Sequence, residues 1–440
     1  MANIKKCPVP VSLKRELGVF QAMMLGLGSI LGTGVFISIG IATNVAGNAV
    51  LLAIACAALL ALCNGISSAQ LAANHPVSGG TYEYGYRWLG PRLGFTAGWM
   101  FMFAKSASAA TAALGLAGYF ALLIGAAPAN ALIYALVSVF LLSMIALTGI
   151  KRSSLFNTII VSITLLSLVS LIVAGLYDAN DLWNLDVSGL LSGLRVEPAN
   201  FLESIALMFV AYTGYGRIAT LGEEVKSPRT TIPVSIMTTL FVSMALYGLI
   251  AFVSIQSIGA KRFGTIATTQ NAPLRIIAET VGSPLLVWVI SLGAITAMLG
   301  VLLNLILGLS RVLLAMGRRR DVPGIFGSVH PDSAVPRMAT YGVTVVITLL
   351  VLIGNVQLTW SFSAFTVLIY YALTNLCAIR LTNEERFYPK WISVLGLFAC
   401  LFLAFWIEWQ VLCAGTVLLV VGQLWQTVGN YRSNGATAAP

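Results

Sequence analysis

Long apolar runs separated by short polar stretches dominate the chain. Runs of about 20 apolar residues, the length that crosses a bilayer as an α-helix, recur along nearly the whole sequence. The pattern predicts an all-α membrane protein with twelve helical spans. The approximate ranges of these spans are 18–40, 46–73, 93–124, 129–149, 155–177, 200–222, 232–256, 284–316, 338–354, 358–380, 389–407 and 409–428.

Two of the expected spans, the first and the sixth, are interrupted by glycines near their middle. The interruptions lie within residues 25–36 and 209–217. Glycine in a helix interior costs about 1 kcal/mol relative to alanine, and irregular backbone at this depth is tolerated only where it lines an enclosed cavity. Two broken helices at corresponding positions indicate the substrate site of a secondary transporter. The alternative is that the glycines only allow close helix packing.

The two broken spans lie five spans apart, and this offset predicts an internal repeat. Because the offset is odd, the second copy runs in the opposite direction through the membrane, as in an inverted 5+5 repeat. The two last spans are then a peripheral pair. The expected segments are an N-terminal segment 1–17, a first repeat 18–177, an external loop 178–199, a second repeat 200–380, a loop with the peripheral helices 381–430, and a tail 431–440.

Charge predicts the orientation of the chain and excludes several functions. Only 9% of the 440 residues are charged, against roughly 25% in soluble domains. The net charge of +10 comes from Lys and Arg in alternate short loops, which places both termini in the cytoplasm and argues against a nucleic-acid partner. The six scattered cysteines and two loop histidines form no metal-like or catalytic pattern. We therefore expect no metal, no enzymatic activity and no cofactor other than a coupling ion.

Each interruption carries backbone groups that suit an amino acid. Free N–H groups at the start of a half-helix attract a carboxylate, and carbonyls before a break suit an ammonium group. Together they would hold the part that all α-amino acids share. The residues expected to bind substrate in this way are Ile30, Gly32, Thr33 and Gly34 at the first break and Val210, Ala211, Thr213, Gly214 and Gly216 at the second.

Several motifs resemble the amino acid–polyamine–organocation superfamily, in particular bacterial amino acid permeases and cationic amino acid transporters. Residues 28–36 are similar to its first-helix signature, and residues 209–214 with 218–229 to its sixth-helix signature. Residues 76–82 resemble its first cytoplasmic loop, and residues 310–316 the end of its eighth helix. The resemblance covers about residues 12–382. It implies the LeuT-type fold, alternating access, an amino acid substrate, and a third helix that faces the cavity at Ala104, Lys105 and Ala109.

Two departures from the family pattern bear on coupling and specificity. The position where many members have an acidic residue is Gly216, and Arg217 follows it. The position of a lysine in the fifth helix of many members is Thr164. Sodium binding through Thr164 and Thr296, proton coupling, and facilitated exchange all stay open.

Lys105 lies in the middle of the third expected span. A charge at this depth costs about 3 kcal/mol on insertion scales and is by default a functional hypothesis. Lys105 could exchange a proton during transport, or it could be a structural lysine bonded to carbonyls. Arg217 could likewise have a structural role, in an ion pair with Glu224 or Glu83.

Three further residues are weaker candidates for gating. Glu223 and Glu224, in the loop after the sixth span, suit a cytoplasmic gate or a structural ion-pair cluster. Tyr212 could gate the cavity, although a buried tyrosine more often serves packing.

The sequence thus predicts a twelve-span amino acid permease of the cell membrane. With Gly216 at the acidic position and Lys105 and Arg217 near the cavity, neutral amino acids are the expected substrates. Acidic amino acids are the runner-up, and cationic amino acids or polyamines the remaining alternative. A channel or nutrient sensor on the same fold is the rival from another class. The expected partners are the substrate and the lipid bilayer, and the oligomeric state is not predicted.

The expected carboxylate site gives a first prediction. Gly34→Leu should abolish transport without preventing folding or membrane insertion, because the side chain would occupy the space of the carboxylate. Uptake of labelled amino acids by the variant in proteoliposomes measures this, and uptake at the wild-type rate would contradict the assignment.

Overall fold

Helices make up almost all of the computed structural model, which describes residues 17–77, 79–127, 130–148, 154–178, 196–220, 225–330 and 335–436. In chain order the helices are α1 (Val19–Ile30), η1 (Gly34–Ser38), α2 (Ile39–Ala46), η2 (Gly47–Ala49), α3 (Val50–Asn74), α4 (Thr81–Trp88), α5 (Pro91–Leu123), α6 (Ala131–Leu147), α7 (Ser154–Asp178), α9 (Pro198–Tyr212), η4 (Thr213–Tyr215), α10 (Gly216–Thr220), α11 (Pro228–Ile258), α12 (Ala260–Thr269), α13 (Pro273–Thr280), α14 (Pro284–Arg318), η5 (Gly324–Gly327), α15 (Arg337–Val351), α16 (Val356–Ile379), α17 (Lys390–Ala404) and α18 (Trp409–Ala436).

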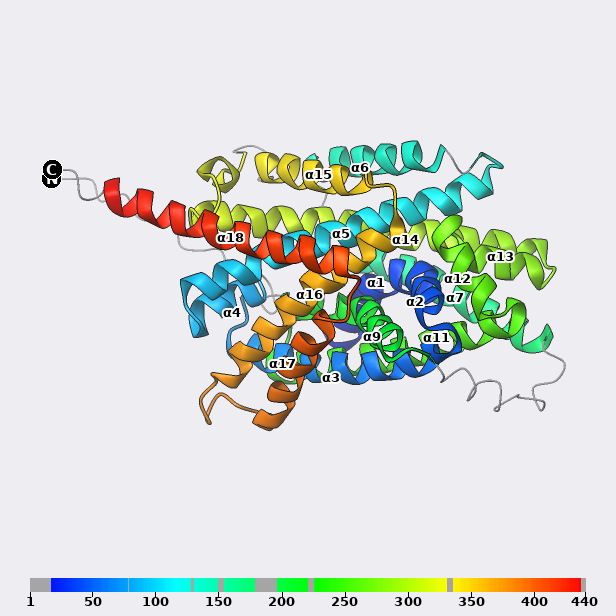
Figure 1. Cartoon of the computed structure of the whole chain (residues 1–440), viewed down its shortest axis with the longest axis horizontal. Coiled ribbons are helices and arrows are strands. Elements are labelled where there is room, and N and C mark those ends of the chain that lie inside the picture. Colours follow the sequence, from blue (N-terminus) through cyan, green and yellow to red (C-terminus); the bar gives the residue numbers. More distant parts are fainter. Residues whose placement is uncertain are drawn as a thin grey trace.

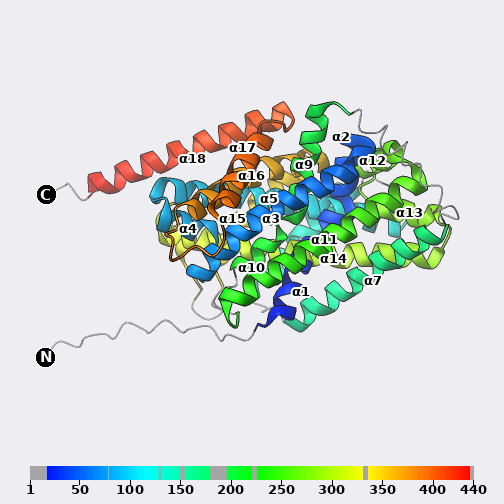
Figure 2. The same ribbon diagram turned by 90° about the horizontal axis from the view of Figure 1, so that it is seen from below.

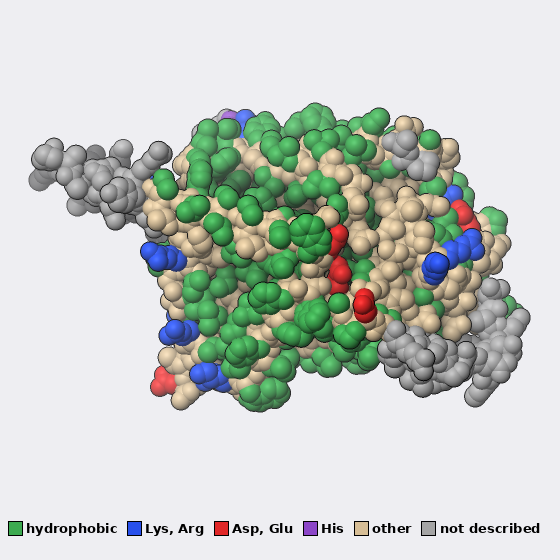
Figure 3. Space-filling model, viewed as in Figure 1, with side chains coloured by type: hydrophobic (Ala, Val, Ile, Leu, Met, Phe, Trp, Pro, Cys, Tyr) green, Lys and Arg blue, Asp and Glu red, His purple; other side chains and the backbone are tan. Residues whose placement is uncertain are grey.

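The long helices form a bundle with two distinct ends (Figure 1). Helix α4 lies at one end, towards which α18 also runs, and the short helices α12 and α13 lie at the other. We call these ends the α4 face and the α12–α13 face; Figure 2 shows the same separation from below. Hydrophobic side chains spread over the middle of the surface in Figure 3, with Lys and Arg towards the two ends. This distribution suits a bundle that sits in a bilayer.

Membrane-length helices are numerous, and the chain is an all-helical membrane protein. Among the described residues, seven helical segments are long and apolar enough to span a membrane, and four shorter apolar helices accompany them. All twelve ranges expected from the sequence hold a helix or a pair of half-helices. That each of them crosses the bilayer, and that the halves form an inverted repeat, stay predictions. Helices α4, α12 and α13 were not expected, because they are too short and too polar for the apolar pattern.

Both expected interruptions are real breaks in the helical backbone. Helix α1 ends at Ile30, and the chain resumes as a π-helix over Gly34–Ser38 before α2. Helix α9 ends at Tyr212 and passes through one 3₁₀ turn into α10. The two breaks touch, because a methyl group placed on Gly214 would lie 2.5 Å from the carbonyl of Ser29. The π-helix is a form that often marks functional sites.

A cluster of aromatic and charged side chains ties α4 to the end of α14 on the α4 face. The hydroxyl groups of Tyr82 and Tyr86 donate to the carboxylate of Asp321 at 2.6 and 2.7 Å. Arg319 lies over both rings and pairs with Glu83. Burial raises the pKa of Glu83, and the charge of Arg319 opposes the rise. The ion-pair partner observed for Glu83 is thus Arg319, whereas the sequence had suggested Arg217.

Candidate functional site

A cavity of about 210 Å³ lies where the two breaks meet. This is smaller than the roughly 300–1,000 Å³ of pockets for drug-sized ligands, so it suits a small metabolite. The breaks, α5, α14 and α16 provide its walls. The lining residues are Ser29, Ile30, Thr33, Gly34, Gly79, Phe101, Lys105, Ser108, Val210, Ala211, Thr213, Gly214, Gly216, Arg217, Val301, Asn304, Leu305, Gly308, Leu309, Arg311, Val312, Ala315, Trp360, Tyr370 and Tyr371.

The first break presents backbone donors to this cavity. The first hydrogen bond after the break runs from Phe36 N to Gly32 O at 3.1 Å. The N–H groups of Thr33, Gly34 and Val35 therefore precede the helical ladder, where a helix has no acceptors of its own. The buried hydroxyl of Thr33 has no hydrogen-bond partner in the structure. Such a group of donors suits a carboxylate. Gly32 lies beside this site, against Val301, and does not itself line the cavity.

The carbonyls at the breaks, which we expected to be unpaired, have partners inside the protein in this conformation. Ile30 O accepts from Gly32 N at 2.9 Å and from Tyr247 Oη at 3.0 Å. Val210 O accepts from the N–H and the hydroxyl of Thr213. Thr213 O accepts from Gly216 N and, at 3.3 Å, from the hydroxyl of Tyr371. The reason is that unpaired carbonyls are costly in an apolar interior.

Tyr247, in the middle of α11, joins the two breaks. Its hydroxyl lies 3.0 Å from Ile30 O and 3.1 Å from Ala211 O, and its side chain is fully buried. A methyl group on Gly34 would lie 2.5 Å from this hydroxyl and 3.2 Å from the methyl group of Ala211. Gly34 is therefore required by the approach of α11, so the expectation that Gly34→Leu leaves folding intact is wrong, and loss of transport in that variant has to be compared with its stability. Sequence reasoning missed Tyr247, since a lone tyrosine in an apolar span carries no local signal.

Helix α5 reaches the cavity through Phe101, Lys105 and Ser108. The ammonium of Lys105 donates to the hydroxyl of Thr213 at 2.9 Å, so it lies at the second break. Ala104 and Ala109, expected to bind substrate, are completely buried and do not line the cavity. The carbonyl of Ala104 accepts from the hydroxyl of Ser363 in α16, which places it against that helix instead.

Arginine side chains line the part of the cavity nearest the α4 face. Arg217 reaches α14, where a methyl group on Gly308 would lie 3.6 Å from its guanidinium. Arg311 follows Gly308 by nearly one helical turn. Glu223 and Glu224, the proposed gate, lie outside the described residues.

The remaining candidates lie away from the cavity. The ring of Tyr212 packs beside that of Tyr247, and its hydroxyl donates to Ile54 O at 3.3 Å. The hydroxyls of Thr164 and Thr296 donate within their own helices, to Ile160 O and Leu292 O. Each of these threonine oxygens keeps a lone pair that could face a cation, and the sodium site stays a prediction.

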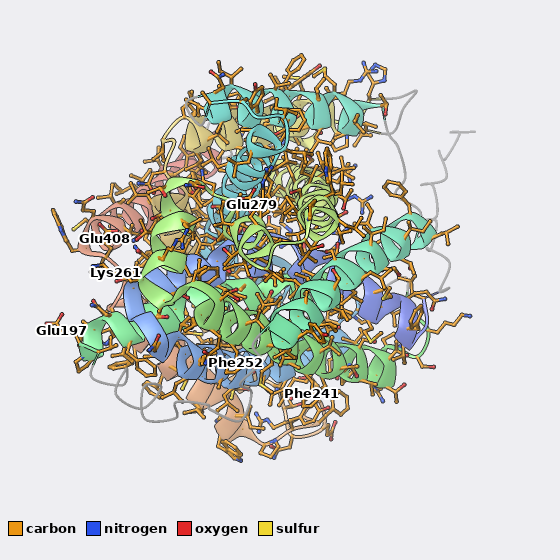
Figure 4. All side chains as sticks on the ribbon, turned by 90° about the vertical axis from the view of Figure 1, so that its right-hand side faces the viewer. Glu197, Phe241, Phe252, Lys261, Glu279 and Glu408 are labelled. Atoms are coloured by element: carbon orange, nitrogen blue, oxygen red, sulfur yellow. The ribbon has the colours of Figure 1, made fainter. Side chains whose placement is uncertain are left out.

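The cavity extends towards the α4 face and is closed towards the α12–α13 face. Gly79, just before α4, and Ala315, near the end of α14, both line it. On the other side the hydroxyl of Tyr119 donates to Phe36 O at 3.1 Å and accepts from Leu274 N at 3.2 Å. Helix α5 is thereby fastened to both the first broken span and α13. Figure 4 looks onto this closed face, with Glu197, Lys261 and Glu408 along one edge.

Comparison with known proteins agrees with the geometry. A sequence model of the family described as "Amino acid permease" matches residues 21–438. An uncharacterized transporter of Mycobacterium tuberculosis is 39% identical over 94% of this chain and 91% of its own length. A branched-chain amino acid permease of Bacillus subtilis is 27% identical over 93% and 92%. A serine/threonine exchanger of Bacillus subtilis is 27% identical over 86% of each chain.

The contact between Gly34 and Tyr247 gives a second prediction. Gly34→Ala should destabilise the protein by about 1–3 kcal/mol through overpacking, and Tyr247→Phe by about 1–3 kcal/mol because the one hydroxyl proton shared by Ile30 O and Ala211 O is lost. The two losses should not add, since Phe removes the oxygen that the new methyl group strikes. Thermal unfolding of the purified variants measures each effect.

Matched controls come from the same helix and from the surface. A methyl group at Gly248, also in α11, would meet nothing within 4 Å, and Tyr341 is exposed in α15. Gly248→Ala should not lower the melting temperature, since alanine is the better helix former and has room there, and Tyr341→Phe should leave it nearly unchanged. Strict additivity in the Gly34→Ala/Tyr247→Phe double variant would show that the two residues do not interact.

Proposed function

Because the chain belongs to the amino acid permease family, whose members are membrane transporters rather than enzymes, we propose that it carries amino acids across the cell membrane by alternating access. The observation that carries this proposal is the cavity at the meeting point of two helix breaks, with backbone donors on one side. The proposal includes twelve spans, the inverted repeat and cytoplasmic termini. On that orientation the cavity is open towards the cytoplasm.

The charges around the cavity bear on the substrate. Lys105, Arg217 and Arg311 line it, and its described lining residues include no Asp or Glu. Two unit charges about 6 Å apart interact by roughly 3 kcal/mol at an effective dielectric constant of 20. A cationic side chain would thus be repelled, which supports neutral or acidic amino acids as substrates. The relatives named for branched-chain amino acids and for serine and threonine favour the neutral class.

A third prediction concerns this exclusion of cations. In counterflow assays with proteoliposomes, neutral amino acids should trans-stimulate uptake, whereas arginine, lysine and polyamines should neither exchange nor compete. Trans-stimulation also separates a carrier from a channel, which shows none. High-affinity arginine exchange without competition by neutral amino acids would refute the proposed selectivity.

A fourth prediction concerns coupling. In the absence of the fifth-helix lysine, Lys105 is the best candidate for proton linkage in the cavity. Uptake of a neutral amino acid in sodium-free proteoliposomes should then depend on a pH gradient, and Lys105→Met should remove that dependence. Lys261→Met, at an exposed position of α12, is the matched control. An unchanged pH profile in well-folded Lys105→Met would rule out Lys105 as the proton carrier and leave it the role of bracing Thr213.

A further inference from the structure

Among the described residues, no carboxylate pairs with the ammonium of Lys105. It is half-buried at the cavity wall, and its one hydrogen-bond partner among the described residues is the neutral hydroxyl of Thr213. Neither ion pair recorded in the described part of the chain involves it. A buried charge is normally paired, because removing it from water without compensation is costly. The cavity beside Lys105 is where the missing negative charge can be supplied.

The charged side chains described around the cavity are all positive. Arg311 lines the same cavity, and among the described lining residues there is no carboxylate. The carbonyls of Val210, Ala211 and Thr213, which could have faced a ligand cation, accept hydrogen bonds from the protein. A ligand group beside Lys105 therefore lies in a positive electrostatic potential. This potential stabilises an anionic group more than a neutral one.

Apart from the arginines nearest the α4 face, the cavity then has two separate places for negative charge. One is formed by the backbone N–H groups at Thr33 and Gly34 in the first break, and the other by Lys105 at the second break. A monocarboxylate can fill only one of them. We propose that Lys105 forms a subsite for an anionic side chain, so that acidic amino acids bind more tightly than their uncharged amides. This rests on the proposed function and departs from the neutral preference that the sequence suggested.

Glutamate and glutamine test the subsite, because they differ in charge but hardly in shape. Binding of both to the purified full-length protein, and counterflow of both in proteoliposomes, should be compared for wild type and Lys105→Gln. Wild type should prefer glutamate by about 30-fold or more, the usual cost of unpairing a buried charge pair. Lys105→Gln, which keeps a donor for Thr213, should lose that preference and bind glutamate and glutamine within about threefold of each other.

Two further variants complete the test. Lys105→Arg keeps the charge and should keep a preference for glutamate, and Lys261→Gln removes an exposed lysine outside the cavity and should behave as wild type. Equal or tighter binding of glutamine by wild type, or an undiminished glutamate preference in Lys105→Gln, would overturn the subsite while leaving the proposed transporter intact. Absence of counterflow with every amino acid would overturn the proposed function itself.

Discussion

Backbone N–H and C=O groups that lose their helical partners must find others inside an apolar bundle, since each unsatisfied group there costs several kcal/mol. In this protein hydroxyl groups from two other helices, α11 and α16, supply partners to carbonyls at both breaks. The hydroxyl of Tyr247 lies between Ile30 O of the first break and Ala211 O of the second. Tyr371 from α16 reaches the carbonyl of Thr213. The breaks are therefore held together as a unit, and the donors at the start of η1 are the groups left to face the cavity.

This arrangement also explains the asymmetry of the cavity. The contact of Tyr119 with Phe36 O and Leu274 N closes the α12–α13 face, while lining residues continue along α14 as far as Ala315 on the α4 face. Alternating access requires this seal to open and the opposite path to close. The cluster of Tyr82, Tyr86 and Asp321 fastens α4 to the end of α14, so it keeps one wall of the open path rigid.

Local sequence patterns predicted the breaks and the helices around them, because glycine in a membrane-length apolar run is itself the physical signal. They could not predict how carbonyls near the breaks are satisfied, since Tyr247 and Tyr371 approach from spans that are distant in sequence. The resemblance placed the third helix against the cavity at Ala104 and Ala109 as well as Lys105, whereas in the structure both alanines are completely buried and do not line the cavity. The ion-pair partner of Glu83 depends on the conformation of the loop after α14. The hydrophobic periodicity of a sequence does not predict such a conformation.

The central claim is that the two breaks and α14 enclose one substrate cavity open to the α4 face. Gly308 tests it directly, because among the described residues a methyl group there would have only the guanidinium of Arg217 within 4 Å, at 3.6 Å. A Gly308→Cys variant without the native cysteines can be treated with a membrane-impermeant thiol reagent from either side of oriented vesicles. We predict labelling from the side of the α4 face, where the described conformation is open, and protection by transported amino acids. Absence of labelling from the α4 face, or labelling that no substrate reduces, would contradict this arrangement.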